Sequence, residues 1–375
     1  MDLSTVLEFV LKGITAFTWQ NAVMIIVGFV LIGLAVIKEY EPVLLLPIGV
    51  GCILANIGMA VGGENFLTII YNAGIATELF PLLIFIGVGA MIDFRPLLAQ
   101  PSLVLLGAAG QFGIYATLIL ATLLGFPLNE AASIGAIGAI DGPTAIFVAT
   151  KLAGPDLLGP IAVAAYSYMS LVPIIQPPIM RALTTRKERL IRMEYAPRPV
   201  SNRAAVLFPI IVTIVISLLA PDAAPLIASL MLGNLLKESG VVDRLSKAAQ
   251  NEIINVSTLF LGLAIGATMT GASFINVRTL MVLGLGLLAF VVDTIAGLLF
   301  GKLMCFVTRG KVNPLIGACG ISAFPMAGRL SAQMALKEDN GNFILMHAMG
   351  SNTAGQLGSV IAGGLLLALV TGIMG

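Results

Sequence analysis

The chain has 375 residues, of which 58% are hydrophobic and only 10% are charged, and its formal net charge is +1. A soluble domain carries about 25% charged residues, so this composition excludes a soluble protein, and the small net charge gives no reason to expect a nucleic-acid partner. The mean hydropathy of +1.03 instead predicts an integral membrane protein.

The first 20 residues do not have the pattern of a signal peptide. Asp2 and Glu8 lie near the start, and there is neither a basic segment before an apolar run nor a clear cleavage site. We expect residues 1–20 to form an N-terminal segment at the membrane surface, with an amphipathic interfacial helix from about Ser4 to Phe17.

Apolar runs follow through the rest of the chain, and a helix needs about 20 residues to cross the hydrocarbon core of a bilayer. These runs do not alternate apolar with polar residues as the strands of a membrane barrel do. The sequence therefore predicts an all-α polytopic membrane protein. The plainest spans are Ala22–Ile37, Ser102–Leu124, Ala204–Leu219 and Leu280–Phe306.

A basic segment, residues 181–203, divides the chain into a first transmembrane half, residues 21–180, and a second half, residues 204–375. The segment contains seven arginines and lysines against Glu188 and Glu194. Because cytoplasmic loops are enriched in basic residues, we expect this loop to be cytoplasmic. Two interpretations stay open, a solvated loop that binds nothing and a loop that docks a partner.

The two halves resemble each other at a constant shift. LLLPIGVGCILANIG at Leu44–Gly58 resembles LIASLMLGNLLKESG at Leu226–Gly240, a shift of 226 − 44 = 182. IGAIGAIDGP at Ile134–Pro143 resembles IGACGISAFP at Ile316–Pro325, again a shift of 316 − 134 = 182. Internal repeats are typical of secondary-transporter folds, so we predict two structural repeats with opposite orientations in the membrane.

The segments at Ile134 and Ile316 are rich in glycine, and each has a proline where a membrane helix would be at mid-span. Corresponding interrupted segments in two halves point to a transport site formed by broken, re-entrant helices. Their free carbonyl groups and helix ends can replace the water shell of a cation. The alternative is a pair of kinked but continuous helices packed through small residues.

Asp141 lies at the first of these breaks, in AIDGPTAIF. A carboxylate beside unwound carbonyl groups is a natural Na⁺ ligand, because hard cations prefer oxygen. It also has the sequence of a helix N-cap, and the two roles are compatible. The second break has Ala323 at the matching position and supplies neutral oxygens instead, from Asn313 and Ser322, with Asn352 later in the chain. Taken singly, Asn313 and Ser322 have the pattern of helix caps.

Arg329 is hard to explain as structure alone. It either neutralises a buried acid or binds an anionic substrate through its two-pronged donor face. Tyr166 and Tyr168 lie in an otherwise apolar segment, where a tyrosine hydroxyl either donates a proton or completes aromatic packing. Asp293 is a second intramembrane acid, for which pairing with a base and a place on a proton path are both open.

Other chemistry has no support in the sequence. Cys52, Cys305 and Cys319 are scattered through apolar segments without metal-site spacing, and His347 is the only histidine. The chain has no Gly-Lys-Ser/Thr loop, so we do not expect it to use ATP directly.

Four segments together resemble the beta subunits of biotin-dependent sodium-pumping decarboxylases, which act on oxaloacetate, methylmalonyl-CoA or glutaconyl-CoA. The segments are AIDGPTAIF, AVAAYSYMSLVPIIQPPIMRALT, NPLIGACGISAFPMAGR and NFILMHAMGSNTAGQLGS. The resemblance runs over essentially the whole chain. The length and short N-terminus look closer to the acyl-CoA enzymes than to oxaloacetate decarboxylase.

The resemblance implies a carboxybiotin decarboxylase subunit that exports Na⁺ across the bacterial cell membrane and consumes a proton from the outer side. The family's functional residues correspond to Asp141, Tyr168, Asn313, Gly317, Ser322, Arg329 and Asn352. It implies catalytic roles for Tyr168, Arg329 and Asp141, and a Na⁺ site at Asp141, Asn313, Gly317, Ser322 and Asn352.

The resemblance also implies partners: a biotin carrier subunit, a carboxyltransferase (alpha) subunit, a small membrane-anchor subunit and further copies of this chain, within membrane lipid. In this mechanism Arg329 meets the carboxylate of carboxybiotin and Tyr168 is the candidate proton donor. The alternative function is a non-enzymatic Na⁺ symporter or Na⁺/H⁺ exchanger, which the repeats and broken helices suit equally.

Overall fold

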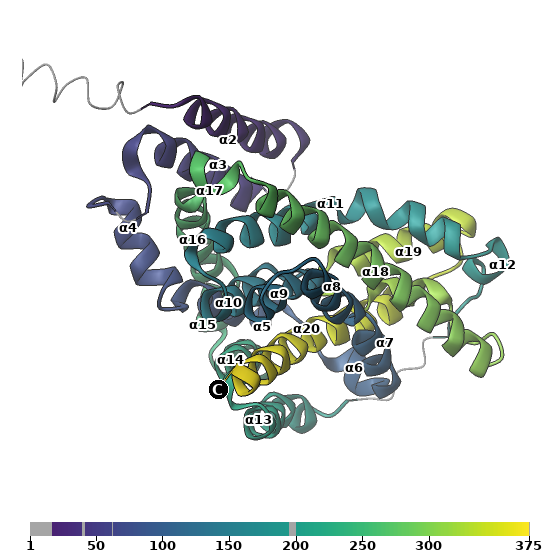
Figure 1. The fold of residues 1–375 in the computed structure, drawn as a ribbon. Helices are drawn as coiled ribbons and strands as arrows, with labels where there is room; N and C mark the ends of the chain where they lie inside the picture. The colour runs from purple at the N-terminus through teal and green to yellow at the C-terminus, as the bar shows by residue number, and fades with distance from the viewer. Residues whose placement is uncertain (1–16, 40–41, 62, 195–199, 375) are drawn as a thin grey trace, which may run out of the picture.

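The computed structural model describes residues 17–39, 42–61, 63–194 and 200–374, and all regular structure in these ranges is helical (Figure 1). Seven of the described helices are long and apolar enough to cross a membrane, and the number rises to nine if each of two bent helix pairs forms one span. The described chain is therefore a multi-pass helical membrane protein, as the composition predicts.

The helical segments follow one another in two halves, with 3₁₀ and π segments labelled η. The first half contains α2 (Trp19–Lys38), α3 (Pro42–Leu54), η1 (Ala55–Met59), α4 (Phe66–Ile70), η2 (Tyr71–Ile75), α5 (Leu79–Met91), α6 (Arg95–Ala99), η3 (Pro101–Leu103), α7 (Val104–Ala109), α8 (Phe112–Leu123), α9 (Leu128–Gly135), η4 (Ala136–Ala139), α10 (Gly142–Leu152) and α11 (Pro155–Leu183). The second contains α12 (Arg186–Arg189), α13 (Asn202–Leu219), η5 (Pro221–Ala223), α14 (Ala224–Ser239), α15 (Asp243–Ala248), η6 (Ala249–Ile253), α16 (Ile254–Thr268), α17 (Gly271–Phe274), α18 (Val277–Val307), η7 (Pro314–Cys319), α19 (Met326–Glu338) and α20 (Leu345–Met374).

Short polar signals set several helix ends. Thr18 and Asn21 form a reciprocal capping box at the start of α2, and the side chain of Asn276 accepts a hydrogen bond of 2.8 Å from the backbone of Thr279 at the start of α18. α14 ends where Gly240 takes a left-handed conformation with φ of 66°. Such caps satisfy N–H and C=O groups that have no partner inside the helix.

Three of the four predicted spans are continuous helices, since Ala22–Ile37, Ala204–Leu219 and Leu280–Phe306 lie within α2, α13 and α18. The fourth, Ser102–Leu124, is interrupted between α7 and α8 at Gly110–Gln111. The predicted interfacial helix from Ser4 to Phe17 lies outside the described residues except at its last position.

The order of elements repeats along the chain. α2 and α13 start 202 − 19 = 183 residues apart, α3 and α14 start 224 − 42 = 182 apart, and α10 and α19 start 326 − 142 = 184 apart. Each half thus has a helical hairpin, a further span, a 3₁₀ segment followed by a break, and a long final helix. This order agrees with the duplication that the sequence predicts.

The halves also contact each other reciprocally, because α3 packs against α16 while α14 packs against α5. Gly51 of α3 lies against the backbone of α16, and Gly233 of α14, which is 182 residues later, lies against the backbone of α5. A Cβ atom at either glycine would collide with the facing helix, so glycine is required for this close approach.

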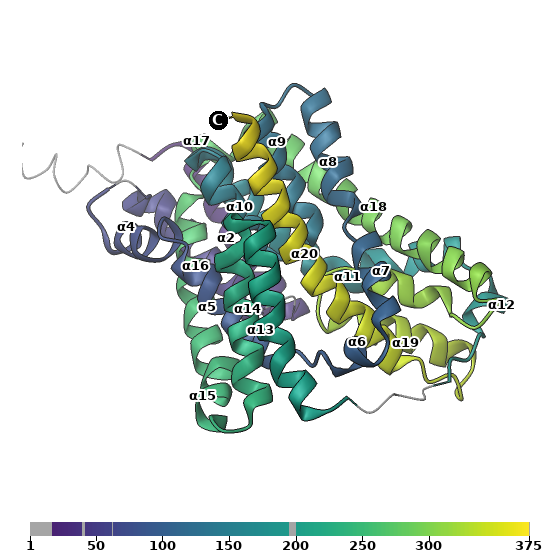
Figure 2. The same cartoon turned by 90° about the horizontal axis from the view of Figure 1, so that it is seen from below.

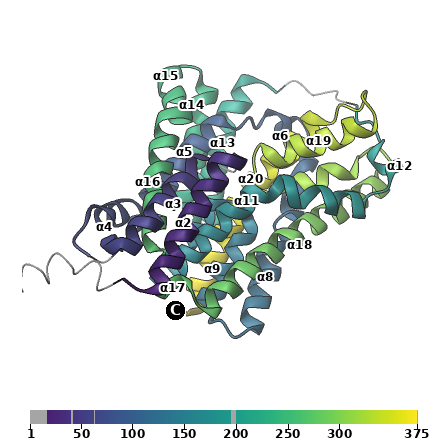
Figure 3. The same ribbon diagram turned by 90° about the horizontal axis from the view of Figure 1, so that it is seen from above.

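The two hairpins lie on opposite sides of the molecule. α13 and α14 are in front in the view from below (Figure 2), and α2 and α3 are in front in the view from above (Figure 3). Reciprocal packing and opposed hairpins are what two related halves produce. Their opposite orientation in the membrane stays a prediction.

The described part of the basic segment, residues 181–194 and 200–203, contacts the rest of the protein. Arg181 lies in the last turn of α11, Arg203 lies in the first turn of α13, and α12 forms a short turn between them. Arg189 pairs with Glu338 at 2.7 Å and Arg192 pairs with Asp339 at 2.7 Å, so the segment is docked on the end of α19. The two interpretations, a solvated loop that binds no partner and a loop that docks one, both stay open.

These ion pairs depend on pH in a definite direction. The hydrogen bond from Arg189 holds the pKa of Glu338 below its ordinary value, and the backbone N–H of Gly341, together with Arg192, lowers the pKa of Asp339. Docking lowers both pKa values. The two carboxylates therefore stabilise the docked segment fully above the ordinary carboxyl pKa of about 4, and this stabilisation is lost as the pH falls through the lowered pKa values.

Because α18 packs closely on η7, we expect replacement of a glycine by alanine to lower stability at the contact between them but not at a position of α18 that faces open space. A Cβ atom at Gly297 would collide with the backbone of Gly317, whereas a Cβ atom at Gly284, also in α18, would meet nothing within 4 Å. Gly297→Ala should destabilise the protein by about 1–3 kcal/mol, and Gly284→Ala should be neutral or stabilising by up to about 1 kcal/mol. Thermal unfolding in detergent checks this, and equal midpoints for the two variants would contradict the packing.

Docking of the basic segment predicts a response to acid. A dye on a cysteine introduced at Lys187, in a variant without the native cysteines, should keep its fluorescence anisotropy from pH 7 down to about 4 and lose it as the pH falls further. Glu338→Gln should give the low value already at pH 7, because it removes the charge that holds Arg189. Lys337→Gln is the matched control and should behave as the parent. An anisotropy independent of both pH and Glu338 would refute the docking role.

Candidate functional site

The first break separates η4 from α10. η4 ends at Ala139, Ile140 has a φ of 51° in the left-handed region, and Asp141 is extended before α10 starts at Gly142. A β-branched residue rarely adopts a positive φ, so the chain leaves the helical path here. The broken-helix prediction is confirmed at this break, and the continuous kinked helix is excluded.

The second break separates η7 from α19. Residues 320–325 belong to no helix, and α19 starts at Met326. The break places backbone N–H and C=O groups that are outside a helix in a buried part of the protein, where each carbonyl group needs a partner.

Three buried amide side chains supply those partners from three different helical segments. Gln111, between α7 and α8, donates to the carbonyl of Gly320 at 3.2 Å. Gln176 of α11 donates to Ala318 at 2.9 Å, and Asn352 of α20 donates to Ile321 at 2.7 Å. The amide oxygens of all three are buried and have no hydrogen-bond partner among the described residues. The second break is therefore ringed by spare oxygen acceptors, the ligand type that hard cations prefer.

Asp141 is 6% exposed and directs one carboxylate oxygen at three donors. Oδ2 accepts hydrogen bonds from Thr144 Oγ1 at 2.7 Å, from Gln356 Nε2 at 3.0 Å and from Ser359 Oγ at 3.3 Å. Asp141 occupies the N-cap position of α10, but its side chain makes no capping bond to the helix backbone. Its carboxylate is thus held by side chains of α10 and α20.

Ser322 connects the second break to Asp141. Its hydroxyl donates to the carbonyl of Gly355 at 3.1 Å and is hydrogen-bonded to the hydroxyl of Ser359, which also contacts Asp141. The structure therefore brings together Asp141 from the first repeat and Ser322 from the second, with α20 between them.

Sequence reasoning missed Thr144, Gln356 and Ser359. Asn352, Gln356 and Ser359 are spaced i, i+4 and i+7, so they lie on one face of α20, and this face is buried. A polar stripe of helical period inside an apolar span is the signal that could have found them.

Two predicted site residues lie elsewhere. Asn313 caps η7 through a 3.0 Å bond from the backbone of Leu315, and its amide group donates to the carbonyls of Arg189 and Ile191. Gly317 lies against Gly297 and Gly301 of α18, where a Cβ atom would collide with the helix backbone. No hydrogen bond between described residues joins either one to Asp141. Both shape the approach to the second break.

The two tyrosines have different surroundings. The Tyr166 ring packs on Gly142 at the first break. Tyr168 is half-buried, donates its hydroxyl hydrogen to the carbonyl of Leu283, and packs against an apolar cluster that contains Ile140 and Ile321 from the two breaks. α11 bends by 60° just after Tyr168, between Met169 and Leu171. Tyr168 therefore lies where both breaks and the bend of α11 meet.

Arg329 lies in the first turns of α19, directly after the second break, and is exposed. Among the described residues its guanidinium group makes no hydrogen bond and no ion pair, so no buried acid there uses its charge. Its neighbour Leu330 packs on the apolar cluster that also contacts Tyr168. The free guanidinium group is available to an anion from outside the chain.

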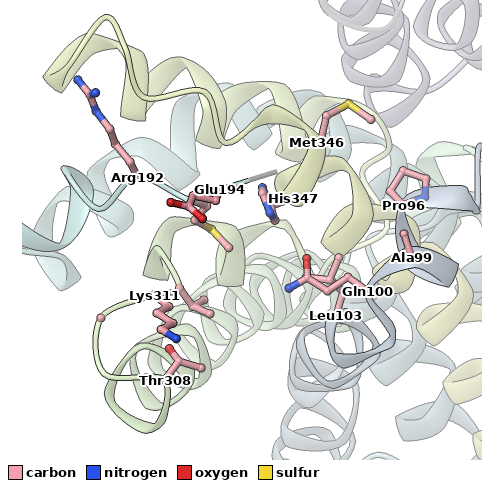
Figure 4. A pocket seen from close by; sticks show the side chains of 13 residues that line it. Pro96, Ala99, Gln100, Leu103, Arg192, Glu194, Thr308, Lys311, Met346 and His347 are labelled. Atoms are coloured by element: carbon pink, nitrogen blue, oxygen red, sulfur yellow. The ribbon is translucent and has the colours of Figure 1, made fainter. Parts of the chain in front are cut away.

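A pocket of about 640 Å³ opens beside the start of α20 (Figure 4). It is lined by Gln100, Leu103, Arg192, Lys311 and His347, among others, and so combines cationic and polar groups with an apolar wall. His347 precedes Asn352 by five residues on α20. The pocket therefore borders the helix whose polar face holds Asp141, on the same side as the docked basic segment.

Comparison with known proteins gives consistent matches. Residues 20–370 match the family described as Na⁺-transporting oxaloacetate decarboxylase beta subunit. The chain is 54% identical over 360 residues to the methylmalonyl-CoA decarboxylase subunit beta of Veillonella parvula, with 96% of each chain covered. It is 52% identical over 363 residues to the glutaconyl-CoA decarboxylase subunit beta of Acidaminococcus fermentans, again with 96% of each covered. It is 47% identical over 413 residues to the oxaloacetate decarboxylase beta chain of Klebsiella pneumoniae, covering 93% of this chain and 95% of that one.

Proposed function

Because this chain belongs to the family of Na⁺-transporting decarboxylase beta subunits, we propose that it decarboxylates carboxybiotin in the bacterial cell membrane and couples this reaction to Na⁺ export. The observation that carries the proposal is the hydrogen-bonded link between Asp141 and Ser322 through Ser359, which joins the two helix breaks. The similar proteins are named as decarboxylase subunits, which favours this function over a non-enzymatic Na⁺ transporter.

The Na⁺ site in this proposal is centred on Asp141, with the hydroxyl of Ser322 and the amide oxygen of Asn352 as further ligands. Asp141 supplies one negative charge and the others supply neutral oxygens, a set suited to a singly charged hard cation. The Asn352 oxygen has no partner among the described residues, so it can bind an ion without breaking a hydrogen bond. Gln356 and Thr144 hold the carboxylate in place. Asn313 and Gly317 act on this site by holding η7 in position.

Carboxybiotin must lose CO₂ for the reaction to proceed. The bond between its ureido nitrogen and the carboxylate carbon breaks, CO₂ leaves, and the nitrogen takes up a proton. Arg329 would bind the carboxylate through two parallel hydrogen bonds, and its free guanidinium group supports this role. Tyr168 is the candidate donor of the proton, for which its hydroxyl would have to leave the carbonyl of Leu283.

The partners follow from the same proposal. A biotin carrier subunit would deliver carboxybiotin after a carboxyltransferase subunit has loaded it, a small subunit would anchor the complex, and further copies of this chain would assemble beside it. The basic segment faces the cytoplasm in this arrangement. The pocket next to it is lined by Lys311, by Glu194 and by Arg192, which pairs with Asp339, and a carboxylated carrier would approach there. The acid or acyl-CoA that loads the biotin is selected by another subunit.

Replacing Asp141 with Asn should abolish Na⁺-dependent decarboxylation of carboxybiotin while the protein remains inserted. Asn keeps the shape but removes the only carboxylate found at either break. The measurement is carboxybiotin decay and avidin-sensitive ²²Na⁺ uptake by vesicles with the whole complex. Asp156→Asn, at an exposed carboxyl at the start of α11, is the matched control and should behave as the parent. Near-normal Na⁺ activation in Asp141→Asn would remove Asp141 from the site.

Arg329→Lys should raise the KM for the carboxylated carrier by about tenfold or more, while the Na⁺ concentration for half-maximal activity changes little. Lys keeps the charge but cannot bind a carboxylate through two parallel bonds. Arg278→Lys, at an exposed ion pair with Glu130, is the control for a general loss of arginine. Carrier kinetics unchanged in the Arg329 variant would show that charge alone is needed there.

A further inference from the structure

The proposed reaction does not use Asp293, an acid in the middle of the membrane span α18. Its side chain is 0% exposed and lies near the centre of a 31-residue apolar helix. Ionised groups at this depth are costly and usually functional. Of the two interpretations that the sequence allows, pairing with a base has no support, because none of the ion pairs between described residues includes Asp293.

One oxygen of Asp293 has a structural explanation. Oδ1 accepts a hydrogen bond from the backbone N–H of Gly113, in the first turn of α8. The first N–H groups of a helix have no partner inside it, and the helix N-terminus favours negative charge. A Cβ atom at residue 113 would lie 2.5 Å from Asp293 Oδ2, so glycine is required where the two helices meet.

The other oxygen has no such explanation. Oδ2 is buried and has no hydrogen-bond partner among the described residues. An ionised carboxylate would leave this oxygen without any compensating positive charge in a site closed to water. The close contact with Gly113 leaves little room for a metal ion and its several ligands, whereas a proton needs only the one oxygen.

The other ionisable groups packed around α18 do not neutralise Asp293. The elements in contact with α18 are α7, α8, α9, η4, η7 and α11, and they carry Tyr115, Glu130, Asp156, Tyr166, Tyr168, Arg181 and Cys319. Glu130 pairs with Arg278, Tyr168 donates to Leu283, and Cys319 contacts the carbonyls of Leu315 and Ala327. Arg181, the one cation in this set, is exposed and forms no ion pair with Asp293.

Asp293 is also connected to the ion site. The position 182 residues earlier is Gln111 (293 − 182), two residues before Gly113. Gln111 donates to the carbonyl of Gly355, the same carbonyl that accepts from Ser322. One short turn at the start of α8 therefore touches Asp293 on one side and the Ser322 end of the ion site on the other.

We propose that Asp293 is a proton-binding site of the pump, whose charge state acts on the Na⁺ site through the start of α8. In the ionised form the carboxylate caps α8 and holds Gln111 against Gly355. Uptake of a proton weakens that cap and loosens the Ser322 side of the site. The inference rests on the proposed Na⁺-exporting function, to which it adds a place for the proton.

Infrared difference spectra of the complete chain in detergent test the proton site without any activity. Exposed Asp and Glu side chains have pKa values of about 4, so they are already ionised above pH 6. The parent should lose a carboxylic-acid carbonyl band as pH rises further. Asp293→Asn should lack this band, while Asp141→Asn and Thr294→Val should retain it. Asn still accepts from Gly113, so capping geometry is kept.

Two results would overturn the proposal. One is a band unchanged in Asp293→Asn. The other is that Asp141→Asn shows no carboxylic-acid band that responds to pH. This second test does not depend on whether an Asp293 variant folds. In the reconstituted complex, Asp293→Asn should also lose the dependence of Na⁺ uptake on outer pH. If the parent complex shows no Na⁺ activation, the proposed function fails, and the infrared bands still decide the proton site separately.

Discussion

Backbone polar groups that leave a helix inside the protein must find other partners, and the rest of this structure depends on that constraint. At the second break the carbonyls of Ala318, Gly320 and Ile321 receive hydrogen bonds from Gln176, Gln111 and Asn352. Without these amides each buried carbonyl would cost about 1–3 kcal/mol. The amides come from α11, from the α7–α8 junction and from α20, so satisfying one short segment ties three parts of the fold together.

The same arrangement produces a site for chemistry. An amide that donates through its nitrogen presents its oxygen on the other side, and here those oxygens have no hydrogen-bond partner in the described parts of the chain. Asp141 adds the only charge, held by Thr144, Gln356 and Ser359. A buried carboxylate surrounded by neutral oxygens gains most from a bound cation or proton. The Na⁺ binding proposed for this site would therefore be favoured by the surroundings of Asp141 as much as by the residue itself.

Coupling between decarboxylation and transport needs the reacting groups and the ion ligands to move together. Tyr168 packs against an apolar cluster that includes Ile140 and Ile321, the neighbours of Asp141 and Ser322 in sequence. Arg329 follows the second break directly, on the helix that this break starts. In the proposed function, a change at carboxybiotin would reach both breaks through this packing. The glycine contacts between α3 and α16 and between α14 and α5 give these movements a rigid frame.

The sequence by itself determined the membrane class and both breaks, because hydropathy and a glycine-rich motif are local patterns, and the same motif singled out Asp141. It did not determine that the span from Ser102 is interrupted, since Gly110 and Gln111 are ordinary in an apolar run. Only the tertiary structure showed that Gln356 and Ser359 contact Asp141 while Asn313 holds the basic segment. The reason is physical: a polar side chain in an apolar helix takes whichever buried partner the packing brings within about 3 Å, and for Ser359 the partner Asp141 lies 218 residues away in the chain.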